Sequence, residues 1–414
     1  MRLELLLRGG RICREGASAP ELLDIRIGKN GRISAIGRAL PADGAEVMAL
    51  EGRLVVPGLV DIHQHLDKSR TRALINNPAG TLEGAIAAYR GIAPTITAED
   101  MIARALRTVE NCSALGTVAI RTHTNIDPQT GLRGIEAMVA MRERCRDRMH
   151  IQVVAHLTGE APSMLVESEE WLSAALALGA DVIGGVPAYS REPLAFMELL
   201  FDTAERTGRP LDMHIDEHID AGRVLFDALA RMTRERGLAG RVVAGHSSAL
   251  GAMPRDDALR TIDLLHEAGV AVVTLPAANL FLQGRSADRL VPRGLTRVGE
   301  LIARGVPVAA ASDNIQDAFV PTGSGDLLEI ARWTLLAGHL GINDLGQAFD
   351  MVSRIPAGLM ELDAGLRVGA RADLLVARSD DVESLVAGGA RERTVLFGGR
   401  VVASTFSVAD TDHA

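Results

Sequence analysis

The chain has 414 residues, of which 47% are hydrophobic and 23% are charged, and its formal net charge is -9 at pH 7. No apolar run approaches the roughly 20 residues that a membrane span needs, and no basic stripe could neutralise a nucleic-acid backbone. We therefore expect neither a membrane nor a nucleic acid as a partner. Because the N-terminus lacks the layout of a secretory signal, we expect a cytoplasmic protein.

Short alternating stretches at both ends of the chain predict a small β unit. Each stretch alternates apolar and polar positions and is bounded by glycine-containing turns. The expected strands are residues 3–7, 23–27, 33–36, 54–56, 372–376, 393–397 and 400–404. We expect residues 1–57 and 360–414 to form one composite β-sandwich.

Between the two ends, β-branched runs alternate with longer amphipathic stretches, which is typical of βα units around a parallel sheet. The eight runs are residues 54–65, 118–123, 151–156, 181–186, 211–214, 241–246, 270–275 and 307–313. Among the intervening stretches, four have clear helical length and apolar spacing: residues 99–115, 168–178, 191–207 and 255–268. We therefore predict an α/β protein in which residues 58–359 form a (β/α)₈ TIM-like barrel.

Histidines and aspartates end most of these runs, at the face where barrels carry their chemistry. His63 and His65 are two apart on the first run, so both side chains point to one side. His214 ends the fifth run and Asp313 ends the eighth. Alone, each is more commonly a structural histidine or a solvated acid. Together, three imidazoles and one carboxylate predict one divalent metal ion, zinc or iron, because calcium and magnesium prefer more oxygens.

Two further residues suit hydrolysis at such a metal. A bound metal can lower the pKa of water to ~7, and the reaction then needs a proton carrier. Glu217, three residues after His214, could move that proton, although acids are also common at helix N-termini. His246 ends the sixth run and could contact the tetrahedral centre together with Asp313, although a lone histidine is more often structural.

These residues and their neighbours resemble the amidohydrolase superfamily, and more closely its cytosine deaminase branch, over essentially the whole chain. The matching segments are HQHLD at 63–67, GTLEG at 80–84, RTH at 121–123, HIDE at 214–217, LQGR at 282–285 and GGRVVAS at 398–404. The resemblance implies that the four expected ligands bind iron or zinc and that Glu217 shuttles the proton. It also implies that His246 helps to hold hydroxide and that Leu82 forms a wall of the ring pocket.

The number of metal ions follows from a missing lysine. Binuclear members of that superfamily generally bridge two metals with a carboxylated lysine from the fourth strand. Residues 181–187, which hold the fourth run, contain no lysine. We therefore expect one metal ion.

Three departures from the cytosine deaminase pattern leave the exact substrate open. Thr158 stands where those enzymes place a glutamine that reads the pyrimidine, and its shorter side chain cannot make that bidentate contact. Asn314 replaces the second acid of the eighth strand, and Phe319 replaces a tryptophan. Asparagine both donates and accepts hydrogen bonds, so the ring groups it favours should differ.

Other segments are similar to N-isopropylammelide amidohydrolase, which removes an alkylamine from a triazine. They are LDKS at 66–69, GGV at 184–186 and SDNI at 312–315. Because Glu217 is retained here and is lacking in that enzyme, we expect hydrolytic deamination of cytosine or a related pyrimidine or cyclic amidine. The alternative is an aminotriazine amidohydrolase that releases ammonia or an alkylamine.

A third interpretation is a barrel that binds a heterocycle without turning it over. It is disfavoured because all four ligand positions are filled. The expected partner is a small heterocyclic substrate, and a homo-oligomer is left open.

Overall fold

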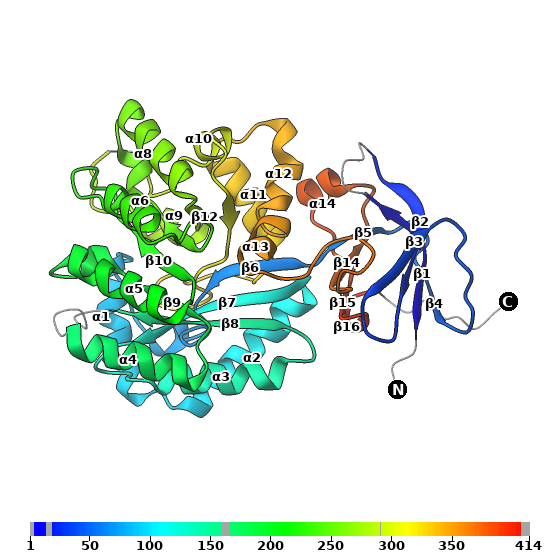
Figure 1. Ribbon diagram of the computed structural model, residues 1–414, viewed down its shortest axis with the longest axis horizontal. Coiled ribbons are helices and arrows are strands. Elements are labelled where there is room, and N and C mark those ends of the chain that lie inside the picture. Colours follow the sequence, from blue (N-terminus) through cyan, green and yellow to red (C-terminus); the bar gives the residue numbers. More distant parts are fainter. Residues whose placement is uncertain (1–3, 14–18, 159–164, 290, 407–414) are drawn as a thin grey trace.

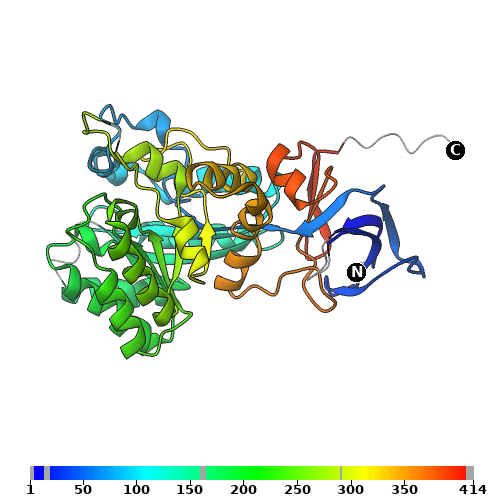
Figure 2. The same cartoon turned by 90° about the horizontal axis from the view of Figure 1, so that it is seen from above.

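The computed structural model describes residues 4–13, 19–158, 165–289 and 291–406. In both views a helix-covered barrel lies on one side and a separate sheet on the other (Figure 1, Figure 2). The two parts are joined by several crossings of the chain, because both chain ends contribute to the separate sheet. The expected α/β barrel with an appended β unit is confirmed. The exact boundaries at 57/58 and 359/360 stay a prediction.

Eight parallel strands form the barrel sheet in chain order. They are β6 (Leu59–Gln64), β7 (Thr117–Ile126), β8 (His150–Leu157), β9 (Val182–Gly185), β10 (Leu211–Ile215), β11 (Val242–His246), β12 (Ala271–Thr274) and β13 (Val308–Ala310). The first and last strands meet at their C-terminal ends, where the backbone N–H of Asp313 donates to the carbonyl of His63 at 2.9 Å. This closure brings residues 250 positions apart in the sequence into one site.

The expected first strand, residues 54–65, is two strands. β5 (Leu54–Pro57) belongs to the separate sheet, and β6 begins after Gly58. A Cβ at Gly58 would lie 2.5 Å from a methyl carbon of Val118, so the chain crosses between sheets where only glycine fits. The prediction of one continuous strand over 54–65 is wrong, because both halves are equally apolar, whereas the overlapping prediction of a strand at 54–56 in the β unit agrees with β5.

The separate sheet has the strand order β16-β15-β14-β5-β1-β2-β3, with β4 paired to β1. Its other strands are β1 (Leu5–Ile12), β2 (Glu21–Ile27), β3 (Ile33–Gly37), β4 (Glu46–Ala49), β14 (Leu374–Ala377), β15 (Arg393–Phe397) and β16 (Arg400–Ser404). β5 and β14 pair antiparallel, with Leu54 opposite Ala377. Apolar side chains of both chain ends, including Ile25 and Leu374, share one buried cluster. The prediction that the two ends build one β unit is therefore confirmed.

The helices cover the outside of the barrel (Figure 1). They are α1 (Leu82–Ile92), α2 (Ala98–Ala114), α3 (Arg133–Cys145), α4 (Leu165–Leu178), α5 (Pro193–Thr207), α6 (Phe226–Glu235), α7 (Ala249–Ala252), α8 (Arg255–Ala268), α9 (Pro276–Leu282), α10 (Val298–Ala303), α11 (Leu327–Ala337), α12 (Leu345–Asp350), α13 (Arg354–Leu359) and α14 (Val382–Gly388). The hydroxyl of Thr81 caps α1 and that of Thr97 caps α2. The four expected helices each match an observed one to within three residues. No helix in the described ranges is both long and apolar enough to cross a bilayer.

Candidate metal centre and active site

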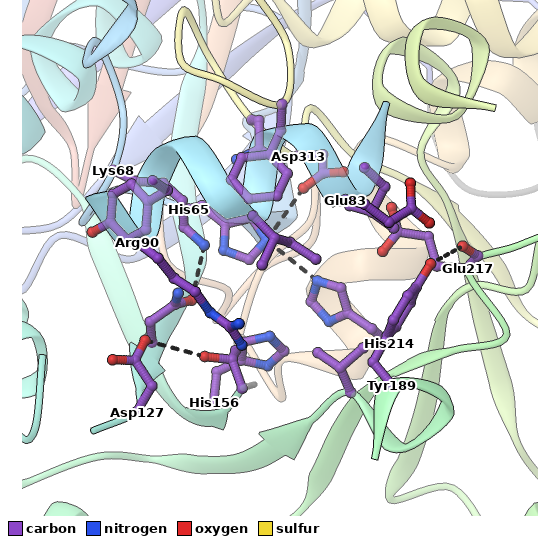
Figure 3. Close-up of a pocket in the computed structure, with 18 of the residues that line it drawn as sticks. His65, Lys68, Glu83, Arg90, Asp127, His156, Tyr189, His214, Glu217 and Asp313 are labelled. Atoms are coloured by element: carbon purple, nitrogen blue, oxygen red, sulfur yellow. Dashed lines mark hydrogen bonds and ion pairs between the residues drawn. The ribbon is translucent and has the colours of Figure 1, made fainter. Parts of the chain in front are cut away.

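A cavity of about 380 Å³ lies at the C-terminal ends of the barrel strands. Its walls include His65, His214, Glu217, His246 and Asp313, which come from four different strand ends (Figure 3). This is the face at which barrels of this kind place their chemistry. The C-terminal ends of several strands predicted from the sequence therefore border one cavity.

The four expected metal ligands meet at the floor of this cavity. Nε2 of His214 lies 3.3 Å from Nε2 of His63 and 3.3 Å from Nε2 of His65. Oδ1 of Asp313 lies 3.3 Å from Nε2 of His65 and 3.8 Å from Nε2 of His63. Each of these four atoms thus lies within 3.8 Å of two of the others.

The chemistry of these atoms fits a divalent cation. The His65 Nδ1 lies 2.9 Å from the carbonyl of His123, so this nitrogen carries the proton and Nε2 is left with a lone pair. Burial lowers the pKa of His63, His65 and His214 well below the usual range, which keeps the rings neutral, as metal ligands must be. The buried Oδ1 of Asp313 has no hydrogen-bond partner among the described residues. A cation at the point of convergence would satisfy this oxygen.

Another histidine, His123, lies against this cluster and was not singled out as a ligand from the sequence. Its ring stacks on His63 with 3.8 Å between centroids, and neither of its ring nitrogens has a hydrogen-bond partner in the described ranges. Two triads have ligand atoms within 4.8 Å of one another: His63, His123 and His214, and His63, His246 and Asp313. The place of His123 at the end of the second run was the available signal.

Backbone strain is concentrated at these strand ends. Asp313, His246, Ser247 and Asp216 all have positive φ values, between 49° and 64°. Such conformations are unfavourable for residues with a Cβ and persist only where the surroundings hold them. One such contact is the bond from the N–H of Ser247 to the carbonyl of Ile215, at 3.0 Å. Two of these four residues, His246 and Asp313, line the cavity.

Glu217 and His246 form a second pair beside the expected ligands. Oε1 of Glu217 lies 3.5 Å from Nδ1 of His246, and Nδ2 of Asn279 lies 3.0 Å from the same nitrogen. Burial and the nearby charge of Asp313 raise the pKa of Glu217 well above its usual range, while burial lowers the pKa of His246 to about 4. A protonated carboxyl beside a neutral imidazole can give and take a proton near neutral pH.

The residues expected to bind the substrate line the same cavity: Leu82, Thr158, Asn314 and Phe319. Nδ2 of Asn314 donates to Oδ2 of Asp317 at 2.6 Å, and Asp317 Oδ1 accepts from the backbone N–H of Phe319 at 2.8 Å. Thr158 lies opposite this loop and donates weakly to Asp127, at 3.4 Å. The cavity wall is therefore built by the loops after β6, β8 and β13.

Sequence reasoning gave no role to several residues that line this cavity, among them Lys68 and His156. Lys68 is 3% exposed, donates to the side-chain oxygen of Asn125 at 2.8 Å, and lies 5.2 Å from the ring centroid of Phe319. His156, at the end of β8, places its ring 4.3 Å from that of His214. Lys68 is one of only two lysines and follows the paired histidines directly, so its position was a usable signal.

The fourth barrel strand has no room for a bridging lysine. β9 ends in Gly184 and Gly185, and a Cβ on Gly184 would lie 2.5 Å from the carbonyl oxygen of Asp212. The imidazole of His156 fills the neighbouring space, 3.4 Å from the same Cβ position. The backbone of the adjacent strand therefore excludes a side chain from this position of the barrel interior.

The amidohydrolase family model matches residues 69–403, which is most of the chain. The chain belongs to the amidohydrolase family. This amidohydrolase is 31% identical over 369 residues to a pterin deaminase from Rhizobium rhizogenes, an alignment that covers 87% of this chain and 83% of the relative. It is 29% identical to an N-isopropylammelide isopropyl amidohydrolase from a Pseudomonas strain, over 85% of this chain and 86% of the relative.

A crystal structure of 5-methylcytosine deaminase from Klebsiella pneumoniae, liganded with 5-fluorocytosine, is similar to this amidohydrolase over its whole length. The TM-score is 0.89 at 30% identity, and 98% of each chain is covered. Together with the curated relatives, this confirms the expectation of a hydrolase that acts on carbon–nitrogen bonds in cyclic amidines. The cluster of histidines and aspartate fits the metal dependence of the family.

Proposed function

We propose that this amidohydrolase removes the exocyclic amino group of cytosine, or of a related pyrimidine or other cyclic amidine, by hydrolysis. The observation that carries the proposal is the buried contact between Glu217 and His246, placed directly beside the converging side chains of His65, His214 and Asp313. One divalent ion, zinc or iron, would be held by these three residues together with His63. When bound, it would lower the pKa of water toward neutrality.

The residues of the chain itself then move the protons. Glu217 would take a proton from the attacking water and deliver it to a ring nitrogen of the amidine, whose carbon gains the C–O bond. A second transfer, of the remaining proton of the added hydroxyl to the amino nitrogen, would let the C–N bond break, the C=O bond form and ammonia leave. His246, with Nε2 4.0 Å from Oδ2 of Asp313, would contact the oxygen added to the ring. Burial raises the pKa of Glu217, which makes its carboxylate a stronger proton acceptor and supports this role.

The polar side chains of the cavity would orient the ring. Among the described residues, Lys68 donates a hydrogen bond only to Asn125, an uncharged amide, so its ammonium retains donors for a ring oxygen. Phe319 and Leu82 would pack on the faces of the ring, and Asn314 would contact its edge. The side chain of Thr158 is too short to form two hydrogen bonds with a pyrimidine. Lys68 would therefore donate one of the hydrogen bonds that a glutamine makes in cytosine deaminases.

A second candidate is hydrolysis of an aminotriazine with release of ammonia or an alkylamine. The identity of 29% with the N-isopropylammelide isopropyl amidohydrolase favours it. Deamination of a pyrimidine or related ring remains our first proposal because Glu217 is present and buried at the reaction centre.

The test is a panel of amino-substituted pyrimidines, pterins and triazines, scored for release of ammonia or alkylamine by the purified enzyme. Metal content is measured on the same samples. We expect about one zinc or iron per chain and ammonia release from at least one single-ring or fused pyrimidine. Release of an alkylamine alone would favour the triazine alternative, and stoichiometric metal without any release would contradict both.

A further inference from the structure

One wall of the cavity is a single face of α1. The residues of this helix that line the cavity include Leu82, Glu83, Ile86 and Arg90, at the spacing of one helical face. Glu83 and Arg90 lie seven residues apart, which corresponds to about 10.5 Å along the helix axis. The helix therefore presents the carboxylate of Glu83 near one end of the cavity and the guanidinium of Arg90 near the other.

The proposed reaction takes place at the end of the cavity where Glu83 lies. Burial is the main reason why the pKa values of Glu217 and Tyr189 are raised, and the charge of Glu83 adds to both shifts, so the three groups are near one another. The hydroxyl of Tyr189 lies 3.4 Å from the backbone carbonyl of Glu217. In the close-up, Glu83, Glu217 and Tyr189 lie on one side of the cavity (Figure 3). The amino group of a substrate would be placed at this end.

The opposite end is basic. Lys68 and Arg90 lie there, across the cavity from Glu217 (Figure 3). Within the described part of the chain, the guanidinium of Arg90 forms no hydrogen bond or ion pair, although Arg90 is half-buried in the cavity wall. The other cation, Lys68, donates to a neutral carboxamide and forms no ion pair with a described residue. Two positive charges thus face the cavity, and neither forms an ion pair with a carboxylate of the described residues.

The carboxylate at this end of the cavity, Asp127, accepts hydrogen bonds from residues of its own loop. Its Oδ1 accepts from the N–H of Gln129 at 2.9 Å, and from both the N–H and the hydroxyl of Thr130 at 2.9 and 3.0 Å. Its Oδ2 lies 3.4 Å from the hydroxyl of Thr158. The N–H groups of the Arg90 guanidinium are therefore available to donate two parallel hydrogen bonds to a carboxylate.

We infer that Arg90 forms a subsite for an anionic substituent, so that the preferred substrate is an amino-substituted heterocycle bearing a carboxylate on the edge remote from its amino group. This inference rests on the proposed function, and it specifies the substrate class of the same cavity. The volume of about 380 Å³ is in the range of pockets for ligands larger than one small ring. Lys68 adds a second positive charge to the same end of the cavity.

The test uses the metal-loaded enzyme and matched pairs of compounds, such as isocytosine and its 5-carboxylate, whose carboxylate lies across the ring from the amino group. KM and kcat are measured for ammonia release, and dissociation constants are measured by calorimetry. The variants are Arg90→Gln, Arg90→Lys and the control Arg107→Gln, which removes the same charge from the exposed face of α2. We expect the wild type to favour the carboxylate, and Arg90→Gln to reduce that preference about 10- to 100-fold, since charge-assisted bonds have that strength.

The possible results distinguish the anion subsite at Arg90 from the proposed deamination. Arg90→Lys should retain part of the preference, and Arg107→Gln should retain all of it. Equal binding of both members of a pair by the wild type, or an unchanged preference in Arg90→Gln, would overturn the anion subsite while leaving deamination intact. If the carboxylate binds better by calorimetry but no compound releases ammonia, the subsite stands and the proposed function fails.

Discussion

Oε1 of Glu217 and Nδ1 of His246 lie 3.5 Å apart in a buried contact beside the converging metal-binding side chains. The two residues come from the ends of neighbouring strands, β10 and β11, which are paired in parallel. Their contact places a proton carrier and a hydrogen-bonding imidazole at one point of the cavity. The first prediction addresses this pair.

Glu217→Gln should lower kcat for ammonia release by about 10²- to 10⁴-fold, the usual contribution of a general acid or base. Glutamine has almost the same shape but cannot carry the proton. Metal content, measured by elemental analysis, should stay at the wild-type value because this residue is not one of the four expected ligands. Undiminished turnover would remove the proton-transfer role.

His214→Ala should abolish stoichiometric metal binding, because Nε2 of His214 is in contact with both His63 and His65. The matched control is His266→Ala on the exposed face of α8, which should retain both metal and activity. Elemental analysis after gel filtration provides the measurement. Retention of a full equivalent of metal in His214→Ala would show that the ion is held elsewhere, for example with His123.

Arg121→Met should destabilise the protein by about 3–5 kcal/mol, because it leaves a carboxylate buried without its partner. Arg121 is 1% exposed and donates to Asp212 at 2.7 Å inside the barrel. Arg231→Met, which breaks the exposed pair with Glu235, should cost less than about 1 kcal/mol. Urea unfolding of the two variants gives the comparison, and equal losses would contradict the prediction.

The free energy of unfolding should depend on pH through Asp317. Burial raises the pKa of this carboxyl to about 7 despite hydrogen bonds from Val320 and Asn314, whereas an unfolded aspartate titrates near ~3.9. Between these values the folded chain retains a proton that the unfolded chain loses. The stability contributed by this group is therefore complete below pH ~4 and is lost as pH rises to about 7.

Asp317→Asn mimics the protonated group and should remove this part of the pH dependence. The difference in unfolding free energy between variant and wild type should shift in favour of the variant by up to about 4 kcal/mol from pH ~4 to pH ~8, since one pKa unit is worth about 1.4 kcal/mol. Urea titrations at several pH values measure it. A difference that is constant across this range would show that Asp317 is ionised throughout.

Much of the site was predictable because its residues follow regular positions in the sequence. His63, His65, His214 and Asp313 each end or approach the end of a β-branched run, and parallel strands present those ends at one face. Hydrophobic periodicity reports burial and does not report which sheet a strand joins, so it assigns residues 54–56 both to the β unit and to the first barrel run.

The sequence by itself determined the barrel, the β unit made of both chain ends, and the set of residues that meet at the C-terminal face of the barrel. Local patterns carry this information because burial imposes a period on each strand and helix. Only the tertiary structure decided that His123 stacks on His63, that Lys68 is buried in the cavity wall, and that Arg90 lines the cavity without a carboxylate partner among the described residues. These relationships depend on the distances between elements far apart in the chain, which are set by packing and by closure of the barrel.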